Sequence, residues 1–230
     1  MNTLPTNLST LPVIIIAGGH SRRLQLGDYQ RKWQLPFGNS TLLGTMLDIA
    51  SQVSATVVIN GAKSDEDKLS DYSYPVIVDD EAQGPLSGLL RALKWGNNNT
   101  HPAIITLTCD TPFIPSDWLR HLEQSFKRSD RLACISRHQQ KYHPLCGIWS
   151  TQLIDDLSRF MASHEKKAVH RWAKAHAEIV DFDACQIKSV TDTDPFININ
   201  TAEEYRRAQM VHQHHVFEQA KHINRTKKME

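Results

Sequence analysis

The sequence has little of several features that would assign it to a special class of protein. Cysteine is scarce and no two cysteines form a C-x-x-C pair, which argues against a disulfide framework and against a structural zinc site. Neither sign of charge is in excess, since 26 Lys and Arg residues stand against 25 Asp and Glu residues. We therefore expect no nucleic-acid partner and no binding to a membrane surface.

Long hydrophobic runs are missing as well. The runs PVIIIA and PAIITL are far too short to span a bilayer, and the first ten residues, MNTLPTNLST, carry neither the cationic nor the apolar part of a secretory signal. With 40% hydrophobic and 22% charged residues, the composition is typical of a soluble globular protein. We therefore expect a cytoplasmic protein.

Familiar catalytic motifs are also absent. The chain contains neither G-x-G-x-x-G nor G-x-x-x-x-G-K-[ST], so dinucleotide-binding and Walker-type sites lack their fingerprint. It contains no H-E-x-x-H motif and no Ser, His and acid at a recognisable hydrolase spacing. Candidate chemistry must therefore be sought from where polar residues fall in the fold.

What the sequence does have is an alternation of strand-like and helix-like segments. Continuous apolar runs, typical of strands that are buried on both faces, cover residues 13–17, 55–60, 74–79, 103–109 and 131–136. Residues 40–53, 84–96 and 115–128 have apolar residues at helical spacing, with Ser40 and Ser116 as the expected caps. The alternation predicts an α/β fold, a three-layer αβα sandwich around a mostly parallel, doubly wound, Rossmann-like sheet.

The C-terminal third is less regular. We expect helices over residues 150–163 and 170–176, a strand over residues 177–182, and a last helix that begins with a capping box of Thr201 and Glu204. No linker-like composition divides the chain, so we predict one domain over residues 1–208 and a polar C-terminal extension over residues 209–230. The histidines of that extension fit a solvated helix end better than a metal site; they are His212, His214 and His215.

Candidate functional residues follow the predicted strands, and in sheets of this kind ligands bind beyond the carboxyl ends of the strands. The first strand ends in Ala17, Gly18 and Gly19, whose backbone can turn sharply and present N–H groups to anionic oxygens. Four cations then follow: Arg22, Arg23, Arg31 and Lys32. The pattern favours a polyphosphate site, although glycines with a few arginines also occur in ordinary loops.

Other polar residues follow the later strands. An isolated carboxylate after a buried strand is costly, so Asp110 either holds Mg²⁺ together with phosphate oxygens or caps the turn that follows. Asp79 can accept two parallel hydrogen bonds from N1–H and the 2-amino group of guanine, a pair that the other bases do not offer. Asn60 either adds a contact or forms a turn, and His143 fits a loop better than a contact to an acceptor substrate.

Together these residues resemble the molybdenum cofactor guanylyltransferases, the MobA family, whose fold is of the nucleotide-diphospho-sugar transferase type. The resemblance covers about residues 13–205 and is carried by segments that stand in the family's order. These segments are IIIAGGHSRR with the following lysine, VVIN, VIVDD before GPLSG, LTCDTPFIP, HPLCGIWS and FININTAEEY. The succession of GPLSG and CDTPF is its most specific part.

The resemblance implies transfer of GMP from GTP to Mo-molybdopterin, with release of pyrophosphate and formation of molybdopterin guanine dinucleotide. It implies Mg²⁺ as the cofactor and Lys32, Asp110 and Arg23 as the catalytic residues. The implied ligand contacts are Ala17, Gly18, Gly19 and Lys32 to the triphosphate, Asn60 and Asp79 to guanosine, Gly84 and Leu86 beside the base, Asp110 to Mg²⁺, and Asn198 and Asn200 toward the metal and the acceptor.

The resemblance also implies partners and leaves alternatives. Cofactor-biosynthesis or delivery proteins and molybdoenzyme chaperones are the protein partners that it suggests, and we expect the enzyme to be a monomer. One alternative is a sister nucleotidyltransferase, either a molybdopterin cytidylyltransferase or a sugar-phosphate nucleotidyltransferase. The other is a noncatalytic homologue that binds nucleotide or cofactor proteins.

One segment departs from the family's pattern. Arg23 and Lys32 are nine positions apart, farther than is usual in the family, and the lysine follows Arg31 where the family has an acidic residue. Arg31 is therefore an alternative to Lys32 as the residue that contacts the triphosphate.

Overall fold

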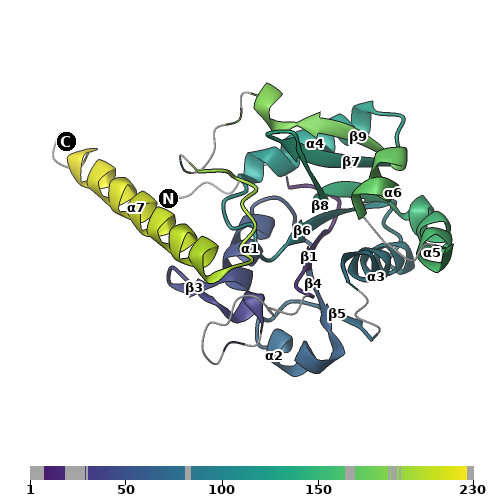
Figure 1. The fold of residues 1–230 in the computed structure, drawn as a ribbon, viewed down its shortest axis with the longest axis horizontal. Coiled ribbons are helices and arrows are strands. Elements are labelled where there is room, and N and C mark those ends of the chain that lie inside the picture. Colours follow the sequence, from purple (N-terminus) through teal and green to yellow (C-terminus); the bar gives the residue numbers. More distant parts are fainter. Residues whose placement is uncertain are drawn as a thin grey trace.

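The computed structural model describes residues 8–18, 29, 31–80, 84–163, 169–185, 187, 191 and 193–226, with the backbone alone over residues 218–226. A seven-stranded sheet forms the centre of the molecule, and helices cover both of its faces (Figure 1). This arrangement confirms the predicted three-layer α/β fold.

The sheet is mostly parallel. Its strands are β1 (Val13–Ile16), β4 (Val57–Ala62), β5 (Val76–Asp79), β6 (Ala103–Thr108), β7 (Ala133–His138), β8 (Lys141–Ser150) and β9 (Ala177–Asp181). They lie in the order β5-β4-β1-β6-β8-β7-β9, and β8 runs antiparallel to both of its neighbours. Because Ile16 of β1 is in register with Asn60 and Thr108, the carboxyl ends of three parallel strands meet at one edge.

The loop expected around His143 is wrong, because this residue lies on β8. The register of β7 against β8 shifts so that Ile135 faces Gly147 while the next residue, Ser136, faces His143. The shift takes Pro144 out of the ladder, where its missing N–H would otherwise break a hydrogen bond. A proline that reads as a loop signal is thus accommodated by a bulge inside a ten-residue strand.

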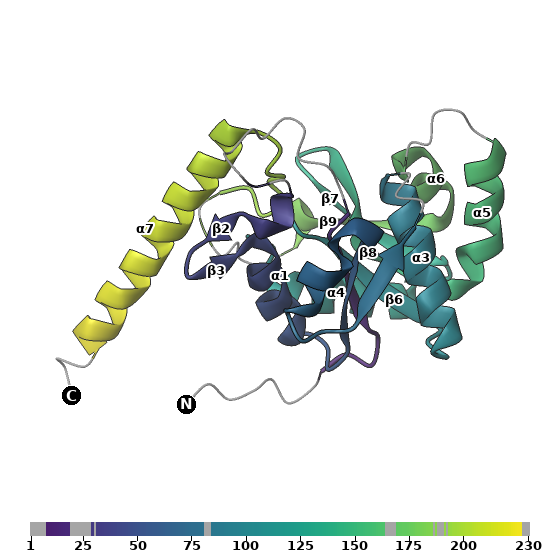
Figure 2. The same ribbon diagram turned by 90° about the horizontal axis from the view of Figure 1, so that it is seen from below.

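Alternate residues of the central strands face two separate cores. Val13 and Ile15 face α1 (Leu42–Ser51), α2 (Glu66–Ser70) and α4 (Ser116–Arg128). Ile14 faces the other layer, which consists of α3 (Pro85–Asn98), α5 (Ile154–Ser163) and α6 (Val169–His176). Figure 2 shows these last three helices together on one side of the sheet, with α1 on the other. Burial on both faces explains why the strands are continuous apolar runs.

Capping side chains define some of the helix ends. The cap of α1 is Thr41, whose hydroxyl accepts a hydrogen bond from the N–H of Gly44 at 3.0 Å, so the Ser40 cap is wrong. The capping box is confirmed, since Glu204 Oε2 accepts from the N–H of Thr201 at 2.9 Å and Thr201 Oγ1 accepts from the N–H of Glu204 at 3.2 Å.

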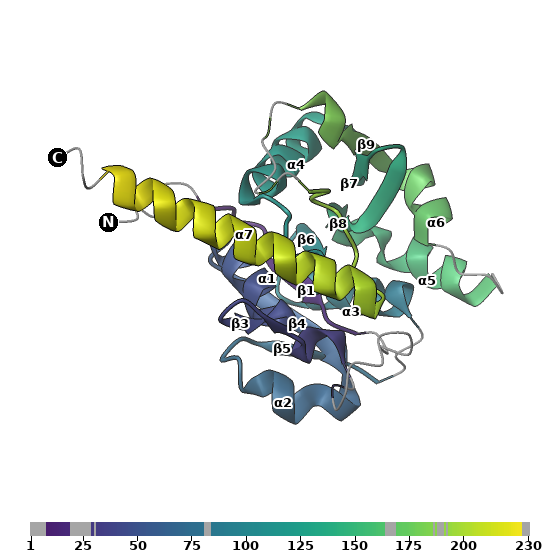
Figure 3. The same cartoon turned by 60° about the vertical axis from the view of Figure 1, so that its left-hand side comes forward.

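A third, smaller core joins the last helix, α7 (Ala202–Thr226), to the hairpin of β2 (Pro36–Phe37) and β3 (Ser40–Thr41). The Tyr205 hydroxyl donates to the carbonyl of Pro36 at 2.5 Å, and the His212 ring lies 4.8 Å from the Phe37 ring. Beyond this contact α7 projects from the body as one unbroken helix (Figures 1 and 3). The predicted boundary at residues 208 and 209 falls inside this helix, and the division into domain and extension stays a prediction. Neither α7 nor any other helix of the described ranges is long and apolar enough to cross a membrane.

Gly38, in the turn of the hairpin, allows a test of this contact. It has φ +58°, and a Cβ atom at this position would collide with the ring of His212. We expect Gly38→Ala to lower the free energy of unfolding by about 2 kcal/mol, because backbone strain adds to a disturbed contact with α7. Urea unfolding followed by circular dichroism measures this loss.

The double variant Gly38→Ala/His212→Ala removes the collision but keeps the strain. In the His212→Ala background, Gly38→Ala should therefore lower the free energy of unfolding by less than it does in the wild-type protein. If Gly38→Ala causes no loss in this background, or the same loss as in the wild-type protein, the division into two causes is contradicted.

Candidate functional site

The first predicted phosphate-binding loop is described in part. Ala17 is buried directly after β1, and its N–H donates to the carbonyl of Asn60 at 2.8 Å. Gly18 follows and is exposed. Gly19 and Arg23 lie outside the described residues, so their predicted roles stay predictions.

Lys32 lies at the centre of the described site. It begins the short 3-10 helix η1 (Lys32–Gln34), and its Nζ lies 2.7 Å from Asp110 Oδ2 and 2.6 Å from Asn200 Oδ1. The Lys32 and Asp110 side chains are 16% and 14% exposed. Asp110 follows β6, and Asn200 precedes α7. Three predicted site residues from distant parts of the sequence therefore meet in one hydrogen-bonded group.

One carboxylate oxygen of Asp110 is left without a hydrogen bond among the described residues. This atom, Oδ1, is buried, a condition that costs about 1–3 kcal/mol unless a ligand satisfies the atom. Carboxylate oxygen is the donor that Mg²⁺ prefers. The described residues hold no group of three or more His, Cys, Asp or Glu side chains able to bind a metal ion. Asp110 therefore suits a cation that takes its other ligands from the substrate or from water.

Arg31 occupies a different place from Lys32. Its Nε lies 2.8 Å from Asp65 Oδ2, and its Nη2 donates to Ser64 Oγ at 2.9 Å. The Arg31 and Asp65 side chains are about nine-tenths buried. Arg31 thus fixes the start of η1 against the segment that follows β4, whereas the neighbouring lysine reaches Asp110.

The predicted guanosine contacts lie on the other side of β1. Asp79 ends β5, is 6% exposed, and accepts from the Ser87 hydroxyl of α3 at 2.9 Å. Arg91 of the same helix lies 3.9 Å from Asp79 and 3.5 Å from Asp80, measured between nitrogen and oxygen. The position of Asp79 is therefore held by both a hydroxyl and a cation.

Asn60 and the loop before α3 complete this side. Asn60 lies within β4, two residues before its end and 1% exposed, so the expectation that it follows the strand is wrong. Gly84 caps α3 with φ +96°, a backbone conformation that favours glycine. Leu86, in the first turn of α3, is buried in the core beneath the sheet and is 2% exposed.

A cavity of about 220 Å³ opens beside Asn198. Its walls include Thr108 at the end of β6, Thr111 three residues later, Pro85 of α3 and His143 of β8. Neither threonine was among the predicted site residues, although their positions within two residues of Asp110 are a signal that could have found them.

His143 is part of the cavity wall. Its ring stacks on Phe196 with 4.6 Å between centroids, and its Nε2 has no hydrogen-bond partner among the described residues. Burial lowers the pKa of His143 from 6.5 to about 4. The ring is therefore neutral near pH 7.

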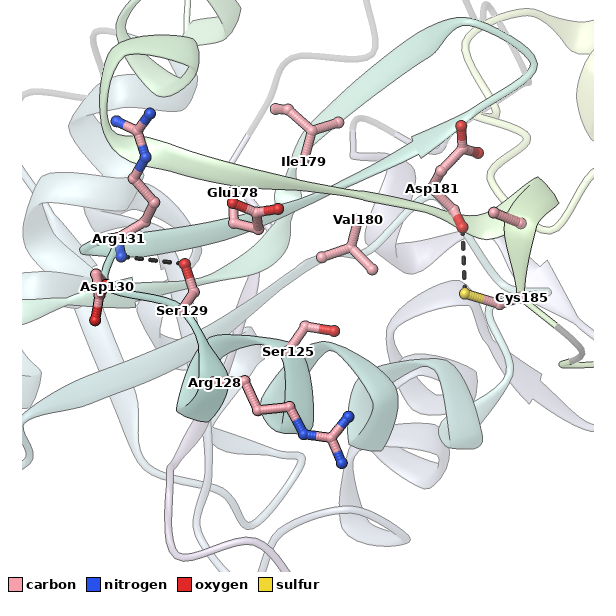
Figure 4. A pocket seen from close by; sticks show the side chains of 11 residues that line it. Ser125, Arg128, Ser129, Asp130, Arg131, Glu178, Ile179, Val180, Asp181 and Cys185 are labelled. Carbon is pink, nitrogen blue, oxygen red and sulfur yellow. Dashed lines mark hydrogen bonds between the residues drawn. The ribbon is translucent and has the colours of Figure 1, made fainter.

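A larger groove of about 700 Å³ lies elsewhere, between the end of α4 and strand β9 (Figure 4). Arg128 at the end of α4 lies on one side of it, and Arg131, Glu178 and Asp181 lie toward β9 on the other. None of the predicted site residues that the structure describes lines this groove. The volume of a pocket therefore does not by itself identify the candidate functional site.

Thiol chemistry does not fit the buried cysteines. Burial raises the pKa of Cys109, Cys134 and Cys146 to about 12, and the charge of Asp110 adds to the effect at Cys109. These residues are therefore thiols at neutral pH and poor nucleophiles. The chemistry of the site consists of the Lys32 cation, the Asp110 carboxylate with one unpaired oxygen among the described residues, and the amide group of Asn200.

Comparison with known proteins identifies the family of the chain. The family model described as the MobA-like NTP transferase domain covers residues 13–179. The chain belongs to the MobA-like NTP transferase family. The family assignment confirms the resemblance inferred from the sequence, and it makes the chain a nucleotidyltransferase.

Relatives agree with the family model. A molybdenum cofactor guanylyltransferase of Mesorhizobium japonicum is 29% identical over 200 residues, which are 85% of this chain and 92% of that protein. The crystal structure of molybdopterin-guanine dinucleotide biosynthesis protein A from Archaeoglobus fulgidus has a TM-score of 0.71 at 20% identity, covering 87% of this chain and 98% of that one. A Mycobacterium tuberculosis protein in complex with manganese has a TM-score of 0.60 at 18% identity, covering 88% and 99%. The two crystal structures show the shared fold.

Lys32 is expected to stabilise the chain even without substrate. Lys32→Met leaves the buried Asp110 carboxylate without its cation, so the free energy of unfolding should fall by about 2 kcal/mol. Lys32→Met/Asp110→Asn removes both charges and should restore most of this loss. Urea unfolding of the four proteins of the cycle measures the coupling between the two side chains.

Lys63→Met is the matched control, because Lys63 pairs with Glu66 at 2.5 Å on the exposed surface. It should leave the unfolding midpoint unchanged. Equal effects of Lys32→Met and Lys63→Met would contradict a buried ion pair at the site.

The lowered pKa of His143 predicts a pH dependence of stability. The folded ring titrates at about 4 and the unfolded ring at 6.5, so between these values the unfolded chain binds a proton that the folded chain does not. The free energy of unfolding should therefore fall as the pH falls from 6.5 to 4. His143→Phe keeps an aromatic ring on Phe196 and should have a shallower slope over this range in urea titrations. Parallel slopes would mean that His143 does not contribute.

Proposed function

We propose that the protein transfers GMP from GTP to Mo-molybdopterin, releasing pyrophosphate and forming molybdopterin guanine dinucleotide. The family membership and the name of the Mesorhizobium relative support this function. The observation that carries it is the contact of Lys32 with Asp110 and Asn200, beside a buried carboxylate oxygen that has no partner among the described residues.

Lys32 has the capacity to bind the triphosphate without leaving Asp110. A lysine ammonium has three N–H donors, and the contacts to Asp110 and Asn200 use two of them. The third is available for an oxygen of the triphosphate. Asp110 Oδ1 would bind Mg²⁺, which supplies charge neutralisation for the triphosphate when it is bound.

The reaction needs little proton transfer from the protein. An oxygen of the acceptor's terminal phosphate attacks the α-phosphorus of GTP, and the bond from that phosphorus to the bridging oxygen of the β-phosphate breaks. The electron pair leaves with pyrophosphate. A phosphate monoester is already anionic near neutral pH, so the chain's task is to bring two anions together and to orient them. Lys32 serves that task, and Arg23 is proposed to do so as well.

Asp79 is proposed to select guanine. A buried carboxylate that Ser87 and Arg91 hold in place can accept hydrogen bonds from N1–H and the 2-amino group of the base. Asn60, Gly84 and Leu86 are proposed to border the nucleoside, and Ala17, Gly18 and Gly19 to contact the phosphates.

The acceptor is proposed to bind beside Asn198 and Asn200. Asn198 lines the 220 Å³ cavity, and Asn200 contacts Lys32, so a phosphate between them would lie next to the triphosphate. We further propose that the enzyme works in the cytoplasm and passes its product to cofactor-delivery proteins or molybdoenzyme chaperones.

The function is tested first by nucleotide binding. We expect the thermal midpoint of the protein with Mg²⁺ to rise with GTP and to stay unchanged with CTP, ATP or UTP, because a ligand at about 100 times its dissociation constant adds about 2.7 kcal/mol to the stability of the native state. Pyrophosphate release that requires both GTP and Mo-molybdopterin then tests transfer. A response to CTP instead would indicate a sister activity, and binding without turnover would indicate a noncatalytic protein.

Inosine triphosphate tests the role of Asp79, because it lacks the 2-amino group of GTP. We expect the wild-type protein to bind GTP at least about tenfold more tightly than inosine triphosphate, the factor expected for one hydrogen bond to a charged group. Asp79→Asn should abolish most of this preference, as measured by calorimetry with Mg²⁺. The control is Asp80→Asn, which changes the exposed neighbour that also contacts Arg91 and should keep the preference. Loss of the preference in both variants would exclude a direct contact from Asp79.

A further inference from the structure

The two asparagines of the acceptor side lie on a segment without helix or strand, residues 193–200, which we call the strap. In Figures 1 and 3 it is part of the yellow-green chain that leads into α7. Its second half is fixed by two backbone contacts: the N–H of Ile199 donates to the carbonyl of Asp110 at 3.1 Å, and that of Asn200 donates to Glu204 Oε2 at 2.7 Å. The first half of the strap contacts His138 instead.

His138 supplies a support from the sheet. It ends β7 and is 8% exposed. Its Nδ1 lies 2.5 Å from Asp183 Oδ1, in the 3-10 helix η4 (Phe182–Ala184) after β9, and its Nε2 lies 3.4 Å from Asp194 Oδ1 of the strap. The ring also packs against Phe196, with 5.7 Å between centroids. One imidazole thus links the sheet, η4 and the strap.

Asp194 connects His138 to the rest of the strap through two hydrogen bonds. Its Oδ1 accepts from the N–H of Phe196 at 2.8 Å, and its carbonyl accepts from the N–H of Ile197 at 3.2 Å. The turn that these bonds form directs Phe196 into the core, where it is 1% exposed. Asn198 and Asn200 follow within six residues of Asp194.

His138 lies between two carboxylates. Asp183 and Asp194 face its two nitrogens. A ring nitrogen that carries a hydrogen donates to the carboxylate that it faces. The other charged or titratable groups nearby are His143 of β8, Lys141 at the start of β8, and the pair of Arg137 and Asp181 between β7 and β9.

We infer that His138 is a positioning residue for the transfer reaction: it holds Asp194, and through the strap it keeps Asn198 and Asn200 beside Lys32 and Asp110. His138 contacts none of these four side chains directly among the interactions that the structure gives. The inference rests on the proposed function for its kinetic consequence, but the hold on the strap itself does not depend on any substrate.

Two substitutions separate positioning from general stability. The side-chain nitrogen of asparagine reaches the depth of Nδ1, and that of glutamine reaches the depth of Nε2. His138→Gln therefore keeps a donor toward Asp194 of the strap, whereas His138→Asn keeps one only toward Asp183. Both variants lose the imidazole and its packing, so their thermal midpoints should fall by similar amounts.

The kinetic result should differ between them. We expect His138→Asn to lower kcat/KM for Mo-molybdopterin about tenfold, and His138→Gln to lower it less than about threefold. In an Asn198→Ala/Asn200→Ala background, His138→Asn should cost less than about twofold, because both asparagines through which it acts are already gone. Additive losses, or equal losses in the two His138 variants, would overturn the inference.

Hydrogen exchange tests the hold on the strap without substrate. In the free protein, His138→Asn should speed amide exchange at Ile197 and Ile199 about tenfold, while His138→Gln stays near the wild type. Arg137→Gln is the matched control, because Arg137 is the adjacent residue of β7 and pairs with Asp181 rather than with the strap. Unchanged exchange in His138→Asn would overturn the inference, whereas faster exchange in a protein that transfers no GMP would overturn the proposed function alone.

Discussion

The contact of Lys32 with Asp110 and Asn200 is the constraint on which the site depends. It joins residues that are 78 and 168 positions apart along the chain, so the site exists only once the N-terminal loop, the central sheet and the C-terminal strap have all assembled. Both charged side chains are less than one-fifth exposed, so it is costly to leave any of their polar atoms without a hydrogen-bond partner. An ion pair in such a place is stable only when its remaining donors and acceptors find partners. Asn200 supplies one such partner, and the substrate is proposed to supply the rest.

The strap is held at both of its ends, and by different means. At its start, His138 contacts Asp194 from the sheet. At its end, Glu204 of α7 accepts the N–H of Asn200, and α7 itself is fixed by Tyr205 and His212 against the β2–β3 hairpin. That hairpin directly follows η1, which begins with Lys32. The last helix therefore ties both partners of the Lys32–Asn200 contact to one small core.

The fold was predictable from the sequence because burial leaves a strong pattern. Strands covered on both faces are mostly apolar, and this is why the ends of β1, β4, β5, β6 and β7 could be predicted to within two residues. β8 was missed because Pro144 and its polar neighbours read as a loop, and only the pairing with two strands distant in sequence makes it a strand. Asn60 was placed past its strand for a related reason, since an amide side chain in the middle of an apolar run looks like the end of the run.

The site was predictable only as far as position along the strands allows. Asp79 and Asp110 stand at strand ends, so topology brings them to the edge where ligands bind. The pairing of Lys32 with Asp110 and not with Asp65 has no local signal, because Arg31 and Lys32 are adjacent cations and tertiary packing alone decides which carboxylate each one meets. His138 has still less signal, as a single histidine at the end of a strand.

The two sides of the site therefore differ in how their geometry is maintained. Asp79 and Asn60 belong to strands, so backbone ladders fix them and any change in their place would disturb the sheet. Asn198 and Asn200 belong to a strap whose path is set by a few side-chain contacts, and single substitutions can alter such contacts without breaking a ladder. On the proposed assignment, the sheet therefore fixes the nucleotide side of the site, whereas the acceptor side depends on the few contacts that hold the strap.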